Sequence, residues 1–153
     1  MNKRYLISLA ALVLVIAVVA GWWFTPSASV ASIQALKCDL NQGECKALSA
    51  QGQSISLQLT PRPVPILKPI QIEAQLQGFV AKPEQIQVVL EGLNMYMGMQ
   101  RAWLKPSANN DEYTGTLQIP SCQEHDMQWK VTLLLPPRSS VERAEFFMQT
   151  HTE

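Results

Sequence analysis

Short segments in which apolar and polar residues alternate constrain the fold of this chain more than any other feature. Residues 54–59, 69–76 and 85–90 change between apolar and polar at almost every position. A period of two gives a β-strand one apolar face, whereas an amphipathic helix needs a period near 3.6. Four of the ten prolines fall in residues 61–69, where they forbid a helix or a central strand. We therefore expect extended, strand-rich structure.

Four further segments are expected to be strands, residues 97–104, 113–119, 127–135 and 141–149. A tryptophan in mid-strand usually points inward, so we expect Trp129 in the core. Alternation places Ala144, Phe146 and Met148 together on one face of the last segment. About seven short strands at regular spacing predict an all-β fold, an immunoglobulin-like β-sandwich over residues 51–150.

The N-terminal segment is expected to be a transmembrane helix. Residues 5–24 form an apolar run of twenty residues preceded by Lys3 and Arg4, and about twenty helical residues cross the hydrocarbon core. The basic flank places the N-terminus in the cytoplasm. Residues 1–26 are thus predicted to be a signal anchor, single-pass in a bacterial inner membrane, with the C-terminal domain in the periplasm. The alternative is a signal peptide cleaved near residues 29–31, which offer a small-x-small site.

The three cysteines fit an oxidising compartment. Cys38 and Cys45 bracket an Asn-Gln-Gly turn sequence, and residues 27–50 are expected to form a linker and a cysteine-bracketed hairpin. A local disulfide between these two cysteines is the expected pairing. It leaves Cys122 unpaired, which calls for burial, a metal or a partner thiol. Pairing of Cys122 with Cys38 or with Cys45 remains an open alternative, because spacing does not determine connectivity.

Charge and motifs exclude several classes of function. Twelve Lys and Arg residues balance twelve Asp and Glu residues, so the chain lacks the basic excess of a nucleic-acid-binding protein. There are two histidines, no H-E-x-x-H motif, no glycine-rich phosphate loop and no helpful Ser-His-Asp context. The sequence therefore predicts a protein that is not an enzyme and that does not bind nucleic acid.

Methionines at alternate positions suggest a site for a soft metal. Met95, Met97 and Met99 would lie on one face if the chain were extended there, and thioethers are ligands that Cu(I) accepts at any pH. Gly98 is expected to separate a loop pair, Met95 and Met97, from Met99 in the following strand. The alternative is that these methionines fill gaps in the core or lie on the surface.

A second stretch supplies further soft or borderline ligands. Cys122, His125 and Met127 fall within a few residues of each other, and each can bind copper if the fold brings the two stretches together. Other interpretations stay open: Cys122 as a buried thiol, His125 as an exposed side chain, and Met127 as a core residue beside Trp129. His151, near the C-terminus, is expected to be incidental.

The order of these segments resembles a known group of proteins. Gly92-Leu93-Asn94-Met95-Tyr96-Met97-Gly98, then Glu112-Tyr113-Thr114-Gly115, then Met127-x-Trp129 is similar to the FixH and YtkA-like group of membrane-anchored periplasmic β-sandwich proteins. The resemblance covers residues 70–135. It implies copper handling and support of haem-copper oxidase assembly, with a respiratory oxidase or a copper chaperone as partner.

Two functional hypotheses follow. The first is a membrane-anchored periplasmic protein that binds or transfers Cu(I) through Met95, Met97 and Cys122, with Met127 or His125 completing the site. The second is a non-metal interaction module that assists assembly of a membrane complex through an exposed patch of Met95, Tyr96, Met97 and Trp103. Mutual proximity of the sulfur atoms discriminates between them.

Overall fold

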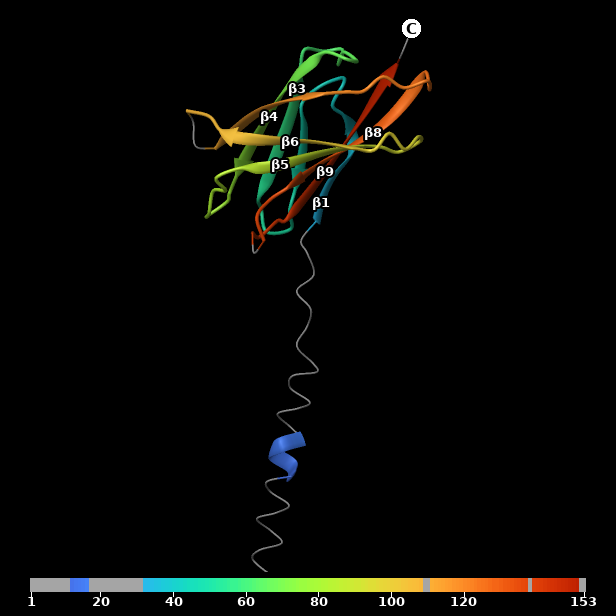
Figure 1. Ribbon diagram of the computed structural model, residues 1–153. Coiled ribbons are helices and arrows are strands. Elements are labelled where there is room, and N and C mark those ends of the chain that lie inside the picture. The colour runs from blue at the N-terminus through green and yellow to red at the C-terminus, as the bar shows by residue number, and fades with distance from the viewer. Residues whose placement is uncertain (1–11, 17–31, 109–110, 138, 152–153) are drawn as a thin grey trace, which may run out of the picture.

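Nine β-strands form one barrel-like sheet in the computed structural model, which describes residues 12–16, 32–108, 111–137 and 139–151 (Figure 1). The strands are β1 (Ser32–Asp39), β2 (Cys45–Leu48), β3 (Ser54–Thr60), β4 (Pro69–Gln77), β5 (Ile86–Gly92), β6 (Met99–Pro106), β7 (Glu112–Gln118), β8 (Asp126–Leu134) and β9 (Arg143–His151). The all-β prediction is confirmed. The expected number of about seven strands is too low, because residues before position 51 contribute two strands to the sheet.

The strand order explains the barrel-like shape. It runs β1-β9-β8-β5-β6-β7-β4-β3-β2. Strands β6 and β7 pair at only two positions, Lys105 with Thr114 and Pro106 with Tyr113, so the sheet bends between them. Figure 1 shows the result, with β5 and β6 crossing in front of β3 and β4. The apolar faces of the two halves therefore enclose a common core.

The alternation of the sequence is repeated in the burial of the side chains. Along β4, Ile70, Ile72, Ala74 and Leu76 point inward, and the intervening residues face outward or are half-buried. Trp129 is buried in the core, and its indole Nε1 donates a hydrogen bond to Thr150 Oγ1 at 2.9 Å. The described residues contain no buried side-chain nitrogen or oxygen without a partner. The inward face expected for Ala144, Phe146 and Met148 is also confirmed.

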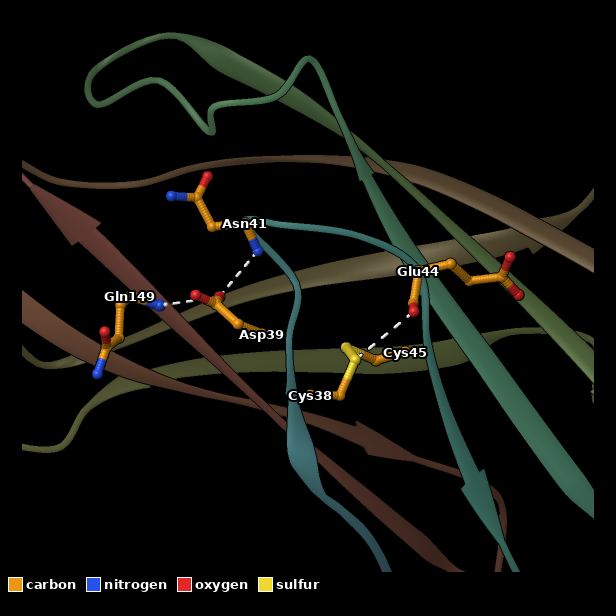
Figure 2. The surroundings of a disulfide bond; sticks show 6 residues. All are labelled: Cys38, Asp39, Asn41, Glu44, Cys45 and Gln149. Carbon is orange, nitrogen blue, oxygen red and sulfur yellow. Dashed lines mark hydrogen bonds between the residues drawn. A yellow bond between two sulfur atoms is a disulfide. The ribbon is translucent and has the colours of Figure 1, made fainter.

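The Cys38–Cys45 disulfide is present, but it does not close a hairpin (Figure 2). Strand β1 pairs in parallel with β9, and β2 pairs antiparallel with β3. The turn reverses the chain as expected, yet a turn sequence does not decide which strands exchange hydrogen bonds. Strands β1 and β2 are the two edge strands of the sheet, so the disulfide joins these edges and helps to close the barrel.

Asp39 fastens the disulfide turn to the end of β9. Its carboxylate accepts hydrogen bonds from the backbone N–H of Asn41 at 2.9 Å and of Gln149 at 3.2 Å (Figure 2). The backbone N–H of Leu40 donates to the carbonyl of Phe147 at 3.0 Å. Three polar contacts thus hold the turn where β1 leaves the sheet.

The strand directions give the barrel two distinct ends. At the first, called the sulfur end, lie the disulfide turn (residues 40–44), the loop of residues 93–98, the segment 119–125 and the end of β9. At the second, called the proximal end, β1 begins at Ser32 beside Arg143, and the loops of residues 49–53, 78–85 and 135–142 lie there.

The expected N-terminal anchor lies mostly outside the described residues. Residues 12–16 are helical, and residues 27–31 of the expected linker are not described. Within the part of the chain that the structure describes, no helix has the length and apolarity needed to span a bilayer.

Candidate metal centre

The loop of residues 93–98 can fold over the sulfur end because two glycines flank it. A Cβ atom added to Gly92 would lie 2.3 Å from the carbonyl oxygen of Met95, so only glycine allows the chain to approach this closely. Gly98 has a φ of 72°, which lets the chain turn into β6 at Met99. The loop therefore contains Met95 and Met97, and Met99 belongs to the strand, as the sequence predicts.

Asn94 fixes this loop to the start of β8. Its side-chain Nδ2 donates to the carbonyl of Asp126 at 2.7 Å, and its Oδ1 accepts from the backbone N–H of Gln128 at 3.0 Å. The backbone N–H of Leu93 also donates to the carbonyl of Gln128 at 2.8 Å. The amide side chain thus replaces a missing strand partner and sets the position of the next residue, Met95.

Met95 and Cys122 are in direct contact through their sulfur atoms. Cys122 Sγ lies 3.2 Å from Met95 Sδ, close enough for the thiol to donate a weak hydrogen bond to the thioether. Metal–sulfur bonds of about 2.3 Å allow two sulfurs on one ion to lie up to about 4.6 Å apart. The two sulfurs are closer than this, so a shared soft metal ion would require them to move apart by up to about 1.4 Å.

Met127 lies in the core beside this pair. Its side chain is 3 % exposed, and its Cε would be 3.1 Å from a Cβ atom on Gly92, the residue over which Met95 folds back. Met127 points to the same side as Trp129, as alternation predicts. It therefore forms an apolar floor beneath the loop, and a thioether ligand from this position requires the side chain to rotate.

The other candidate ligands take different positions. Met97 is half-buried and packs against the core, and Cys122 does the same. His125 is exposed on the segment that precedes β8. Met99 is 49 % exposed on β6, which is the surface position expected as one alternative. The structure thus brings Met95 and Cys122 together and leaves Met99 outside the site.

An ion pair and an open cleft lie at the same end of the barrel as the site. His151 Nδ1 and Asp126 Oδ1 lie 2.5 Å apart at the junction of β8 and β9, and both side chains are exposed. His151 therefore joins the end of β9 to the start of β8. Between the disulfide segment and Leu93 lies an open cleft of about 370 Å³, whose lining includes Lys37 and Gln128.

The donors that meet are soft. Met95 supplies a neutral thioether, and Cys122 supplies a thiol that releases its proton when it binds a metal. Such a pair suits Cu(I) better than hard cations, which prefer oxygen ligands. Within the described ranges, no group of three or more His, Cys, Asp or Glu side chains could hold a metal ion.

Gly92 and Asn94 are residues of the site that reasoning from metal ligands misses. A Gly-Leu-Asn sequence directly after a strand is a turn signal. That signal could have pointed to the loop, but the hydrogen-bond partners of Asn94 lie 32 and 34 residues further along the chain. Only the pairing of β5 with β8 brings them within reach.

Comparison with protein-family models, with curated proteins and with solved structures finds no match to this chain. The resemblance to the FixH and YtkA-like group therefore stays a prediction. A fold by itself does not define a function, so the function has to be argued from the site.

Proposed function

We propose that this chain is a membrane-anchored periplasmic protein that binds Cu(I), or passes it on, at the sulfur end of its barrel. The observation that supports it best is the 3.2 Å contact between Cys122 Sγ and Met95 Sδ. These residues come from segments 27 positions apart, and Asn94 and Gly92 hold the loop in this arrangement. A thiolate and a thioether would be the two primary ligands.

Further ligands are available close by. Met97 lies in the same loop, and Met127 lies beneath it. Rotation of one of these flexible side chains would allow a second thioether to approach the ion as a third ligand, since methionine adopts many conformations at little cost. His125 is the alternative third ligand and would favour Cu(II). Few ligands and an exposed edge at Met95 suit reversible binding, which transfer requires.

Three features support the proposed membrane anchor, periplasmic location and partner. The apolar run of residues 5–24 would anchor the protein, and the Cys38–Cys45 disulfide is typical of an oxidising compartment. The resemblance to the FixH and YtkA-like group, whose fold is an immunoglobulin-like sandwich, extends this proposal. The protein would also support the assembly of a respiratory oxidase. A respiratory oxidase or a copper chaperone would be the partner.

A second candidate function is an assembly module that works without metal. Exposed large apolar side chains concentrate between residues 93 and 103, where Leu93, Met95, Tyr96, Met99 and Trp103 are 37–76 % exposed. Methionine and aromatic residues are enriched at protein interfaces. This surface would bind a membrane partner directly, and copper would have no part in it.

Titration of the reduced full-length protein with Cu(I), against a chelator that competes for the ion, tests the first proposal. We expect one Cu(I) per chain. Cys122→Ser should weaken binding by about 100-fold, or about 2.7 kcal/mol, because a neutral hydroxyl replaces a thiolate. Met95→Leu should also weaken binding, because it removes a thioether while keeping the apolar volume.

Met99→Leu is the matched control for Met95→Leu. It makes the same change four residues away on the outer side of β6 and should leave the Cu(I) affinity unchanged. Equal affinities of the wild type, Cys122→Ser and Met95→Leu would refute the metal site. Co-purification of an oxidase subunit with the Cys122→Ser protein would then favour the assembly module.

A further inference from the structure

The proximal end of the barrel carries an exposed apolar surface on the side from which the N-terminal segment leaves. Val80 is 102 % exposed, and apolar neighbours surround it. Together they form what we call the apolar rim: Phe79, Val80, Ala81, Pro83, Pro136 and Pro137. The rim borders an open cavity of about 450 Å³. Val80, Ala81, Pro136 and Pro137 are exposed, and Phe79 and Pro83 are half-buried. Single exposed apolar residues are ordinary, but a group on one end of a molecule indicates a contact surface.

The rim is held firmly by contacts behind it. Tyr113 donates its hydroxyl proton to the carbonyl of Pro83 at 2.8 Å, and Phe79 packs against the core. Gln53 Nε2 donates to Ser140 Oγ at 2.5 Å, which joins the loop of residues 49–53 to the loop that carries Pro136 and Pro137. Val80 therefore projects from a supported loop.

The position of β1 relates this rim to the membrane. Strand β1 begins at Ser32, beside Arg143 and next to the loop that carries Pro136 and Pro137. Only residues 25–31 separate Ser32 from the apolar run of residues 5–24. A segment of this length reaches about 25 Å at most when fully extended. If the run is an anchor, the proximal end must stay within that distance of the bilayer.

We propose that the apolar rim rests on the lipid surface of the membrane that holds the chain. This inference depends on the anchor of the proposed function but not on its copper site. Tethering keeps the rim at a high effective concentration near the lipid, so a modest apolar area is enough for contact. The salt bridge between Lys82 and Asp111, 2.6 Å apart, neutralises charge beside the rim. Glu84 is exposed in the same loop, so the apolar side chains have to supply the contact with the lipid.

The contact would give the barrel a defined orientation. Strand β8 runs from the sulfur end at Asp126 to the proximal end at Leu134, and nine strand residues extend about 30 Å. Met95 and Cys122 would then face away from the lipid, toward the periplasm. A partner that exchanges copper with this site would have to reach about that height above the bilayer.

Fluorescence of the full-length chain in phosphatidylethanolamine–phosphatidylglycerol vesicles tests the proposal. In a Cys122→Ser background, Val80→Cys carries an environment-sensitive dye at the rim, and Tyr96→Cys carries it at the sulfur end. Both positions are exposed, so neither label disturbs the core. Contact with lipid should shift the emission at position 80 to the blue, and nitroxide lipids should reduce that emission by about twofold. Neither effect is expected at position 96. Raising the salt from about 0.1 M to about 1 M should not reverse this effect, because screening acts on charges.

Three results would overturn the proposal. Equal, weak quenching at both positions in protein that floats with the vesicles would show that the barrel stands clear of the lipid. A blue-shifted but unquenched dye at position 80 would show that residues 25–31 or a second copy cover the rim. Protein that fails to float with the vesicles would remove the anchor on which the contact depends, while the Cu(I) titration would be unaffected.

Discussion

The two ends of the barrel are built in different ways. At the sulfur end, the loop of residues 93–98 bends back on Gly92 and is fixed by Asn94, so that Met95 meets Cys122. At the proximal end, the loop that carries Val80 extends outward and presents apolar side chains. One end brings two sulfur-containing side chains into contact, and the other exposes apolar side chains.

The same strands therefore support two kinds of surface, a candidate small-ligand site at one end and a broad apolar surface at the other. The sulfur end suits a small ligand, because two sulfur atoms meet there and the polar contacts of Asn94 hold the loop that carries Met95. The proximal end suits a broad and fluid surface, because it offers area without directional groups. Changes at each end should therefore affect different properties.

Gly92→Ala should have the largest effect and should break the sulfur end. The added Cβ would lie 2.3 Å from the Met95 carbonyl oxygen and 3.1 Å from Met127 Cε, so the loop has to move. We expect the free energy of unfolding to fall by about 3 kcal/mol, and the Cu(I) affinity to fall with it. Urea denaturation and Cu(I) titration measure the two effects.

Gly98→Ala is the matched control in the same loop. No atom lies within 4 Å of a Cβ added there, so the cost comes only from its positive φ and should be about 1 kcal/mol. If both variants lose the same stability, close approach at Gly92 does not determine the loop.

The sequence predicts much of the fold because the strand signal is local. Alternation identifies the inward faces of β4 and β8, with Ile70, Ile72 and Trp129 buried as expected. It fails for the pairing of β1, whose partner β9 lies more than 100 residues away. The turn sequence at Asn41 predicts that the chain reverses there. It does not predict that the two edges of the sheet meet at the disulfide, because that depends on the pairing of all the strands.

The candidate site, like the fold, is only partly predictable from the sequence. Residue chemistry singles out Met95 and Cys122, and the pairing of β5 with β8 is needed to bring them together. The roles of Met97, Met127 and His125 as ligands stay predictions, because Met97 and Met127 pack in or against the core and His125 is exposed. Asn94 is a residue whose function is visible only once its partners at positions 126 and 128 are in place.

Asn94→Asp should have an intermediate effect. It tests whether the hydrogen bonds of Asn94 position the loop for Cu(I) binding. The carboxylate keeps an acceptor for the backbone N–H of Gln128 but loses the donor to the Asp126 carbonyl, so one hydrogen bond becomes a repulsion. We expect a loss of about 1 kcal/mol of stability and an approximately tenfold weaker Cu(I) affinity. The same denaturation and titration measure both values.

Gln51→Glu makes the same change from an amide to a carboxylate on an exposed residue of the loop between β2 and β3, at the proximal end. It should alter neither value. A fall in Cu(I) affinity with Gln51→Glu as large as with Asn94→Asp would mean that overall charge, and not loop position, determines binding.

Tyr113→Phe should have the smallest effect, and it tests the proximal end. Tyr113 is buried, and its hydroxyl donates to the Pro83 carbonyl behind the apolar rim. Losing one hydrogen bond should cost about 1 kcal/mol at neutral pH. Hydrogen exchange should become faster in the loop of residues 78–85 and stay unchanged at the sulfur end. Tyr96→Phe, which removes an exposed hydroxyl, should change neither.

The pH dependence gives this variant a second signature. Burial, and to a lesser degree the negative charge of Asp111, raises the pKa of Tyr113 above its ordinary value of about 10. Above that pH the unfolded chain loses the phenolic proton while the folded chain retains it, so the wild type loses stability as pH rises toward the folded pKa. Tyr113→Phe has no proton to lose there. Its stability deficit should therefore shrink between neutral and strongly alkaline pH, and a deficit that stays constant would mean that the folded and unfolded chains ionise Tyr113 alike.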